Sequence, residues 1–222
     1  MAILACARVN HLVITGGGGG LARAVVAAFN APDWSVRAPV RAELDVTDPA
    51  AVAAYFSALE VDLLVCAAGV TRDAPLARLR EDDRDEVLAV NFHGAAACAA
   101  AVLPGMIRRG SGHLVFISSR SAIHPPAGQT AYAAAKAALL GLSEALAREN
   151  GRHGIRSNVI LPGFLETAMT ATVSSARKSE VLAEHALGSF NTPAAVADFI
   201  RHLHHSLPHT SGQVFQLDSR PA

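Results

Sequence analysis

The chain has 222 residues, which is enough for one large α/β domain or two small ones. Hydrophobic residues make up 51% of it and charged residues 17%, so the chain can bury a sizeable core. The formal net charge is zero, which argues against a nucleic acid or an anionic membrane as the main partner.

The N-terminal segment is apolar but short, and it lacks the basic region of a signal peptide. No later stretch reaches the roughly 18 apolar residues that a membrane span requires. The cysteines Cys6, Cys66 and Cys98 are odd in number, far apart and in apolar surroundings, which indicates buried thiols in a reducing compartment. We therefore predict a soluble, cytoplasmic protein.

A run of glycines at 16–20 is the first feature that carries chemistry. The apolar residues 11–15 before it predict a buried strand, and the Ala-rich residues 21–29 after it predict a helix. Glycines let the backbone approach phosphates, and a helix N-terminus offers unpaired N–H groups. A glycine run can also be a flexible linker. Its position between a strand and a helix favours a loop that binds pyrophosphate.

The next segment is unusually short. Residues 34–38 predict a second strand, and Asp45-Val-Thr-Asp48 follows after only six residues. A parallel crossover needs about a dozen residues or more. Two alternatives follow: the helix between the second and third strands is missing and the third strand is a stub, or the third strand is absent.

The charges at the end of the second strand bear on the cofactor. A site specific for NAD usually holds the ribose diol with an acidic residue at this point, and none is present. Arg37 and Arg41 are there instead, which favours the 2′-phosphate of NADP. The alternative is that both arginines are merely solvated.

The rest of the chain alternates strands with helices and shows no internal repeat or linker, so we expect one domain over residues 1–222. The strand predicted at 61–66 ends in Ala67, Ala68 and Gly69, whose small size would let a ring or ribose lie close to the backbone. Residues 168–190 are polar and irregular, as expected of a lid over a pocket. Further helices are predicted at 49–59, 81–90, 95–106, 133–149 and 192–205, and further strands at 114–118, 155–161 and 213–217.

Three groups that can handle protons follow the strand predicted at 114–118. Ser119 comes directly after it, Tyr132 thirteen residues later, and Lys136 four residues after that. Tyr132 and Lys136 share one face if the stretch is helical. A nearby ammonium favours the phenolate and lowers the pKa of a tyrosine. Alone, this pattern is more often packing than chemistry; its position at a sheet edge favours proton transfer at an oxygen atom.

Histidines near the C-terminus raise the question of a metal site. His202 and His205, spaced i and i+3, could together chelate a metal ion. However, no carboxylate or cysteine pattern accompanies these two histidines, and none accompanies His204 or His209. We expect no metal here, and instead a solvated histidine face or a subunit contact.

Taken together, the motifs resemble those of the short-chain dehydrogenases/reductases over nearly the whole chain. The shared pattern consists of Thr15-Gly-x-x-x-Gly20-Leu-Ala22, Asp45-Val, Ala67-Ala-Gly69, Asn91, Ser119, Tyr132-x-x-x-Lys136 and Pro162-Gly-x-x-x-Thr167. Within the family the chain looks most like β-ketoacyl-[acyl carrier protein] reductases. The resemblance implies a three-layer αβα Rossmann fold, that is, a doubly wound parallel sheet, here without the helix between the second and third strands.

The resemblance also implies roles for individual residues. Tyr132 would protonate the carbonyl oxygen as hydride arrives, and Ser119 would hydrogen-bond that oxygen. Lys136 would bind the nicotinamide ribose and lower the pKa of Tyr132, and Asn91 would hold a water that links Lys136 to solvent. The residues implied to bind the cofactor are Gly16, Gly18, Gly19, Gly20, Leu21, Arg37, Asp45, Val46, Ala67, Ala68, Gly69, Tyr132, Lys136, Pro162, Gly163, Leu165 and Thr167.

The chain departs from the family pattern at three points. Ala22 replaces the third glycine, and Cys66-Ala-Ala-Gly69 replaces the usual Asn-Asn-Ala-Gly. The shortened segment before Asp45 is similar to that of dihydropteridine reductases and dTDP-4-dehydrorhamnose reductases. These departures concern the adenine end of the cofactor and leave Asn91, Ser119, Tyr132 and Lys136 intact.

The expected activity is hydride transfer between NADP(H) and a carbonyl or secondary alcohol. A β-ketoacyl thioester on a carrier protein or CoA is one candidate substrate; another ketone or a pteridine is the alternative. A dinucleotide sensor or structural pseudoenzyme on the same fold is the rival function. Ala-rich helices and family habit suggest a homodimer or homotetramer. The residues expected to line the substrate pocket are Arg120, His124, Gln129 and Phe164.

Overall fold

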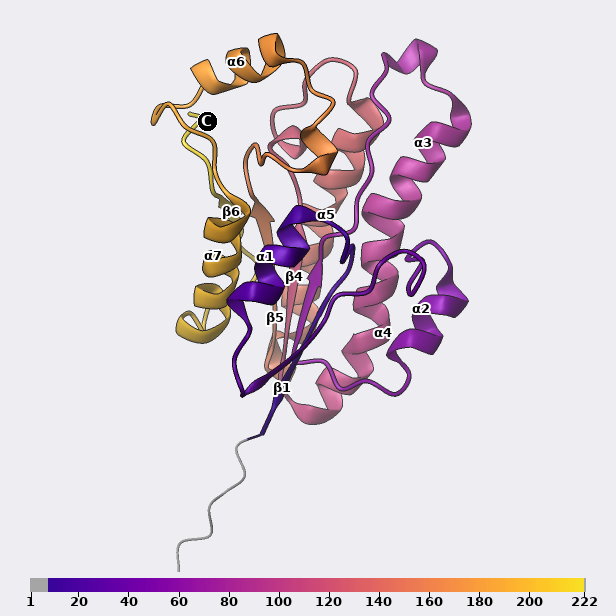
Figure 1. The fold of residues 1–222 in the computed structure, drawn as a ribbon. Helices are drawn as coiled ribbons and strands as arrows, with labels where there is room; N and C mark the ends of the chain where they lie inside the picture. The colour runs from indigo at the N-terminus through magenta and orange to yellow at the C-terminus, as the bar shows by residue number, and fades with distance from the viewer. Residues whose placement is uncertain (1–7, 222) are drawn as a thin grey trace, which may run out of the picture.

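The computed structural model describes residues 8–221, in which six parallel strands form one sheet with helices on both faces (Figure 1). The strand order is β2-β1-β3-β4-β5-β6. The expected doubly wound α/β fold is confirmed. The strands are β1 (Asn10–Ile14), β2 (Trp34–Arg37), β3 (Leu63–Cys66), β4 (Gly112–Ile117), β5 (Ile155–Leu161) and β6 (Val214–Gln216).

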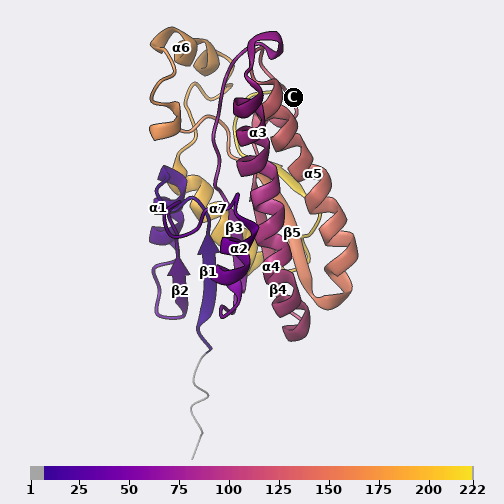
Figure 2. The same ribbon diagram turned by 90° about the vertical axis from the view of Figure 1, so that its right-hand side faces the viewer.

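The helices bury apolar faces against both sides of this sheet. On one side α1 and α7 pack together over Leu12 and Ile14, and on the other α2, α4 and α5 cover Val13 and Leu64 (Figure 2). Continuous apolar runs such as β4, buried along its whole length, are typical of strands that are covered on both faces. The helices are α1 (Gly20–Ala28), α2 (Pro49–Phe56), α3 (Glu81–Leu88), α4 (Gly94–Arg109), α5 (Thr130–Asn150), α6 (Ser175–Ala183) and α7 (Pro193–Ser206).

The chain reverses its direction of travel across the sheet after β2, because β2 lies on one side of β1 and β3 on the other. In open α/β folds, ligands bind at such a switch point, beyond the carboxyl ends of the strands. The glycine loop follows β1, and residues 67–69 follow β3. The topology therefore brings two of the expected cofactor segments together.

The segment between β2 and α2 contains no third strand. Residues 38–48 form turns, and the side chains of Leu44 and Val46 are buried in the core beside α2 and α4. Asp48 ends the segment by accepting hydrogen bonds from the first N–H groups of α2. Of the two alternatives, the third strand is thus absent, and β2 is the edge of the sheet.

The gap between the helices predicted at 81–90 and 95–106 is a π-helical turn, Ala89–His93, between α3 and α4. The combined helix Glu81–Arg109 is long and apolar enough to cross a membrane by length and composition alone. Its α4 part packs against the sheet and α2, as the core helix of a globular fold does. It is therefore weak evidence for a membrane span.

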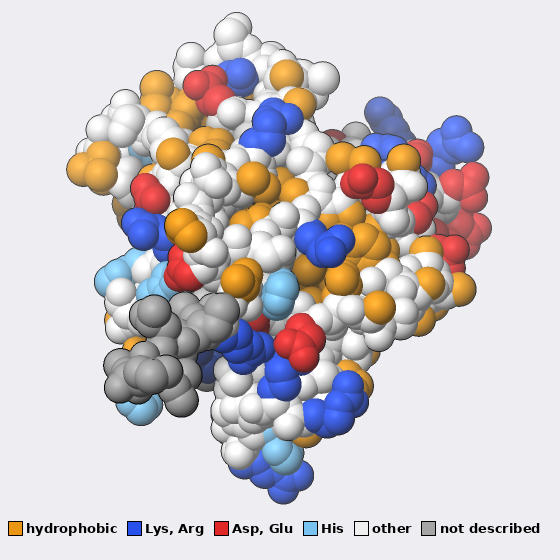
Figure 3. Space-filling model, turned by 60° about the horizontal axis from the view of Figure 1, so that its bottom comes forward, with side chains coloured by type: hydrophobic (Ala, Val, Ile, Leu, Met, Phe, Trp, Pro, Cys, Tyr) orange, Lys and Arg blue, Asp and Glu red, His pale blue; other side chains and the backbone are white. Residues whose placement is uncertain are grey.

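The surface carries charges of both signs. On the face shown in Figure 3, basic and acidic side chains occur together with apolar ones between them. Arg8, for example, pairs with Asp62 at 2.8 Å and lies 3.7 Å from Glu60. This mixture agrees with the zero net charge of the sequence.

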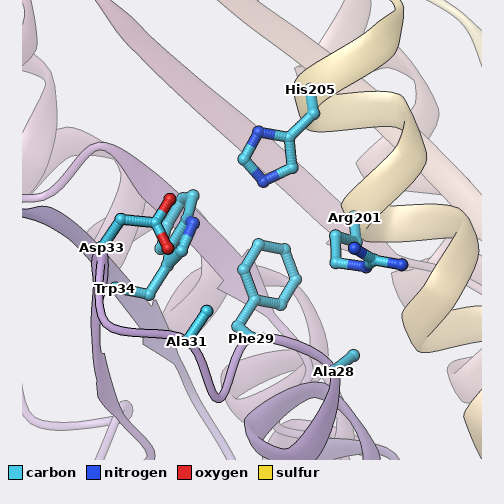
Figure 4. Close-up of a pocket in the computed structure, with 7 residues that line it drawn as sticks. All are labelled: Ala28, Phe29, Ala31, Asp33, Trp34, Arg201 and His205. Carbon is cyan, nitrogen blue, oxygen red and sulfur yellow. The ribbon is translucent and has the colours of Figure 1, made fainter.

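An aromatic cluster lies at the amino end of β2, whereas Ser119 follows the carboxyl end of β4. The Trp34 ring packs edge-on against Phe29, His204 and His205, with centroid distances of 4.7, 5.2 and 5.5 Å. A hollow of about 290 Å³ opens beside it, between the end of α1 and α7 (Figure 4). Within residues 8–221, no three His, Cys, Asp or Glu side chains lie close enough to share a metal ion.

The expectation of a solvated histidine face is wrong for His204. Its Nδ1 lies 3.3 Å from Nδ1 of His113, which is buried in β4 and whose Nε2 lies 3.1 Å from Asn158. Arg156 donates to the carbonyl oxygens of Leu203, His204 and Leu207 and so closes the C-terminal end of α7. Burial, followed by the charges of Arg156 and His205, lowers the pKa of His204 to about 4.

We expect the fold to lose stability as the pH falls from about 6.5 to about 4. In that window the unfolded chain binds a proton at residue 204 and the folded chain does not, which removes up to about 3 kcal/mol. Urea denaturation at pH 7.5 and 4.5 checks this. His204→Gln should reduce the loss, whereas His93→Gln, a change at an exposed histidine, should not. An equal loss in His204→Gln and the native chain would contradict the prediction.

Candidate active site

Ser119, Tyr132 and Lys136 meet beyond the carboxyl end of β4. Ser119 follows the strand, and α5 presents Tyr132 and Lys136 one turn apart on the same face. The Ser119 hydroxyl lies close enough to the Tyr132 phenol to lower its pKa. Lys136 Nζ lies 5.7 Å from the centroid of the Tyr132 ring and donates to the carbonyl oxygen of Ile117 at 2.9 Å. The structure thus brings the three groups together as expected.

The helix that carries two of these groups is fixed to the strand that carries the third. Ser118 Oγ donates to the carbonyl oxygen of Lys136 at 2.8 Å, and both residues are buried. This bond spans 18 positions in the sequence and sets the register of α5 along the end of β4. Ser118 was not among the expected site residues, although its place at the end of a buried strand indicated that it lies next to the site.

The pKa of Tyr132 does not follow the expectation. Burial raises it to about 12, while the hydrogen bond with Ser119 lowers it and the charge of Asp73 raises it further. Lys136 was expected to lower this pKa, and the chain alone shows the opposite direction, because loss of hydration is the largest effect. Tyr132 is accordingly a phenol near neutral pH, the form that can give up a proton.

Burial disfavours the charged form of Lys136. Its side chain is 4% exposed, and burial lowers its pKa to about 8. Among the described residues its amine has one hydrogen bond, to Ile117, so further N–H groups remain for a ligand.

Asn91 completes the group of four expected catalytic residues. Its Nδ2 donates to the carbonyl oxygens of Val70 and Val87 at 2.8 Å each. Its Oδ1 is buried and has no hydrogen-bond partner within the described part of the chain. A Cβ atom at Gly69 would lie 2.8 Å from this Oδ1 and 3.6 Å from Lys136 Nζ, so both atoms face the backbone of Gly69.

The glycine loop fits a dinucleotide. Gly16 has a φ of +76°, and a Cβ at Gly17 would lie 1.9 Å from the carbonyl oxygen of Ala38, so both positions require glycine. The helix α1 starts at Gly20 with no side-chain cap and no acidic residue in its first turn. Its first N–H groups are therefore open to an anion, and the orphaned Asn91 Oδ1 and the buried Lys136 amine mark the other end of the same site.

The two remaining cofactor segments lie on either side of this loop. Thr167 packs on Gly20, where a Cβ would lie 3.0 Å from its Cγ2, and Leu165 is buried. Pro162-Gly163 forms the turn after β5, with Gly163 at a φ of +82° against Asp218. At the adenine end, Asp45 accepts from Thr47 and pairs with Arg41 at 3.3 Å.

The four residues expected in the substrate pocket differ in their surroundings. Arg120 donates to the carbonyl oxygen of Pro221 at 2.9 Å, and Phe164 packs on Phe190 with a centroid distance of 4.6 Å. Gln129 is held by Ser121 and Asp73 at 2.8 and 2.7 Å. His124 is exposed.

Sequence reasoning missed the C-terminal tail, residues 217–221, as a part of the site. Asp218 contacts Gly163, and Asn191, which directly follows the predicted lid, donates to the carbonyl oxygens of Pro162 and Leu217. The signal was available, because the tail follows β6 and the carboxyl ends of parallel strands meet at one edge. The lid itself, 168–190, contains α6.

Comparison with known proteins identifies the family of the chain. A family model described as short chain dehydrogenase matches residues 38–178, more than half of the chain. The chain is 38% identical to the 3-oxoacyl-[acyl-carrier-protein] reductase of Thermotoga maritima and 36% identical to that of Salmonella typhimurium. The matched segments cover 71% and 72% of this chain, but only 65% and 68% of those enzymes.

Likeness in structure extends further along the chain. The crystal structure of a 3-oxoacyl-[acyl-carrier protein] reductase from Brucella melitensis superimposes with a TM-score of 0.86 at 25% identity. The match covers 95% of this chain and 90% of that one. Sequence and structure therefore agree that the chain belongs to the short-chain dehydrogenase/reductase family and is most similar to its 3-oxoacyl-[acyl-carrier-protein] reductases.

Proposed function

We propose that the protein is an NADP(H)-dependent reductase of a carbonyl group, with a 3-oxoacyl thioester as the leading candidate substrate. The observation that carries the proposal is the group of Ser119, Tyr132 and Lys136 at the end of β4, next to an open helix N-terminus. Lys136 and Asn91 both face the backbone of Gly69. A dinucleotide sensor needs the open helix N-terminus but has no use for a group of proton-transferring side chains.

The roles of the side chains follow from their protonation. The bound nicotinamide would supply hydride to the carbonyl carbon. Tyr132, a phenol at neutral pH, would give its proton to the carbonyl oxygen, and the Ser119 hydroxyl would hold that oxygen in place. Lys136 would bind the nicotinamide ribose, and Asn91 Oδ1 would accept from a water that returns a proton to the site.

The preference for NADP rests on the residues after β2. Gly17 N–H donates to the carbonyl oxygen of Pro39, so the segment that begins with Arg37 lies against the glycine loop. Arg37 is exposed at the end of β2 and free to meet a 2′-phosphate. Arg41 is held 3.3 Å from Asp45, which makes it the weaker candidate.

Parallel assays with NADPH and NADH test the proposal. With a panel of ketones and 3-oxoacyl thioesters, we expect oxidation of the cofactor. We also expect the dissociation constant of NADPH to be about 10- to 100-fold lower than that of NADH, the size of one or two charge-assisted hydrogen bonds. Arg37→Gln should reduce the difference between the two dissociation constants, and Arg152→Gln, a change at an exposed arginine, should not. Stoichiometric NADPH binding without oxidation of any substrate would favour the sensor.

Other properties complete the proposal. The buried free thiols of Cys66 and Cys98 support a reducing, cytoplasmic location, while Cys6 lies outside the described residues. The names of the relatives support a thioester on a carrier protein or on CoA as the partner. The exposed alanines of the long helices support a homodimer or homotetramer, as is habitual in the family.

A further inference from the structure

Two buried nitrogen atoms beside the proposed active site have no hydrogen-bond partner within residues 8–221: Arg120 Nε and His185 Nε2. Arg120 directly follows Ser119, and His185, 5% exposed, belongs to the lid. Buried polar atoms are nearly always hydrogen-bonded, so two orphans at one site call for an explanation. We infer that Arg120 and His185 bind a carboxylate of the substrate, so that the enzyme prefers keto acids to the thioesters named above as the leading candidate; this rests on the proposed reductase function.

The C-terminal tail holds both residues on the same side of the site. Arg120 Nη2 donates to the carbonyl oxygen of Pro221 at 2.9 Å, and His185 Nδ1 lies 3.3 Å from Ser219 Oγ. Ser219 and Pro221 are two residues apart, a span of at most about 7 Å. The tail thus brings the loop after β4 and the lid to one place.

Ser219 allows His185 to present a donor at Nε2. Ser219 Oγ accepts from the N–H of Leu187 at 3.2 Å and can donate its own hydrogen to His185 Nδ1. In that tautomer the ring hydrogen is on Nε2. His185 Nε2 and Arg120 Nε are then both donors, and the partner that both lack among residues 8–221 is an acceptor oxygen.

The charges around the two donors favour an anion. Asp218 is occupied by Arg220 at 2.6 Å and by Gln216 at 2.9 Å, and Glu184 lies 3.7 Å from Arg220. In the part of the chain that the structure describes, the Arg120 side chain has one hydrogen bond, to a neutral carbonyl group. Among residues 8–221, the guanidinium group therefore has no counter-ion.

The surroundings strengthen an ionic contact. Phe190 packs on Phe164 and lies edge-on to His185, with a centroid distance of 5.5 Å. These rings shield one side of His185 from water, and charge-assisted hydrogen bonds are stronger where the dielectric constant is low. A planar carboxylate, which can accept from two donors at once, fits better than a lone neutral carbonyl.

A matched pair of substrates tests the inference. Acetoacetate and methyl acetoacetate share the reacting ketone and differ in the carboxylate. We expect the native enzyme to have the lower KM for acetoacetate. Arg120→Gln should raise the ratio of the acetoacetate KM to the ester KM about tenfold or more, the size of one charge-assisted hydrogen bond, with a smaller effect on kcat. Arg120→Lys should restore part of the ratio, and Arg152→Gln should leave it unchanged.

Variants of His185 give an independent reading. His185→Gln keeps a side-chain N–H and should change the KM ratio less than His185→Leu does. If every variant raised both KM values equally, Arg120 and His185 would serve only to hold the tail, and the inference would be overturned.

Direct binding separates this inference from the proposed function. Calorimetric titration of acetoacetate into the protein with NADPH should show binding that Arg120→Gln weakens. If neither substrate were reduced but this binding and its loss were seen, the reductase proposal would fail and the carboxylate site would stand. Absence of acetoacetate binding to the native protein would overturn the inference even if the ester were reduced.

Discussion

Replacing Tyr132 by phenylalanine is expected to lower kcat by about 10²- to 10⁴-fold, the usual contribution of a positioned general acid. The phenol is the group that the structure holds protonated beside Ser119, and its removal leaves the ring and the helix α5 unchanged. Steady-state kinetics with NADPH and the best ketone of the panel measures this loss. Fluorescence titration should show NADPH binding retained.

Tyr55→Phe is the matched control for Tyr132→Phe. Tyr55 lies in α2 and packs edge-on against Phe56, away from Ser119. It should keep its kcat, which separates proton transfer from a general effect of losing a tyrosine hydroxyl. Full activity in Tyr132→Phe would refute the proposed mechanism.

The pH dependence of the rate is a second test of proton transfer by Tyr132. In the chain alone burial raises the pKa of Tyr132 to about 12, so reduction, which consumes the phenol form, should not weaken as the pH rises from 6 to 8 on account of this residue. The reverse reaction needs the phenolate and should gain rate as the pH rises. The positive charge of an oxidised nicotinamide acts in the direction that favours this phenolate.

Local patterns predicted the parts of the fold that depend on neighbouring residues. The spacing of Tyr132 and Lys136 and the apolar run before Ser119 were enough to place three groups at one sheet edge, because a strand and a helix fix where side chains point. The break at Asn91 was also visible. The segment between Arg37 and Asp45 left two alternatives, since its length excluded a normal crossover but did not show that Leu44 and Val46 enter the core.

What could not be predicted depends on which distant segments meet. The direction of the Tyr132 pKa follows from burial, which no local pattern reports. His204 was read as solvated because its partners, Trp34 and His113, come from strands far away in the sequence. The tail with Ser219 and its bond to His185 is likewise a tertiary contact. Motifs therefore located the proton-transfer groups, and only the folded chain showed what surrounds them.

Lys136→Met is expected to separate stability from activity. A buried amine with one hydrogen bond among the described residues is destabilising at neutral pH, because the lowered pKa, about 8 instead of 10.5, corresponds to about 3 kcal/mol. An apolar side chain of similar length removes this cost but leaves the carbonyl group of Ile117 unpaired, at about 1 kcal/mol. The free energy of unfolding of the protein without cofactor should rise by about 2 kcal/mol at pH 7.

The same substitution should abolish most of the activity, since Lys136 is the group proposed to hold the nicotinamide ribose, and NADPH binding should weaken with it. The pH dependence identifies the cause. Lys136 should add stability to the native chain as the pH rises from about 8 to 10.5, where the unfolded state still binds the proton that the folded amine has lost. This gain opposes the loss from the buried thiols of Cys66 and Cys98, whose pKa values burial raises, and which all the variants share. Lys136→Met should lack this gain, while Lys178→Met, a change at a lysine paired with Glu166 at 3.5 Å, should keep it. A less stable Lys136→Met protein would mean that the amine holds α5 to β4, and that its burial serves the fold and not the bound cofactor.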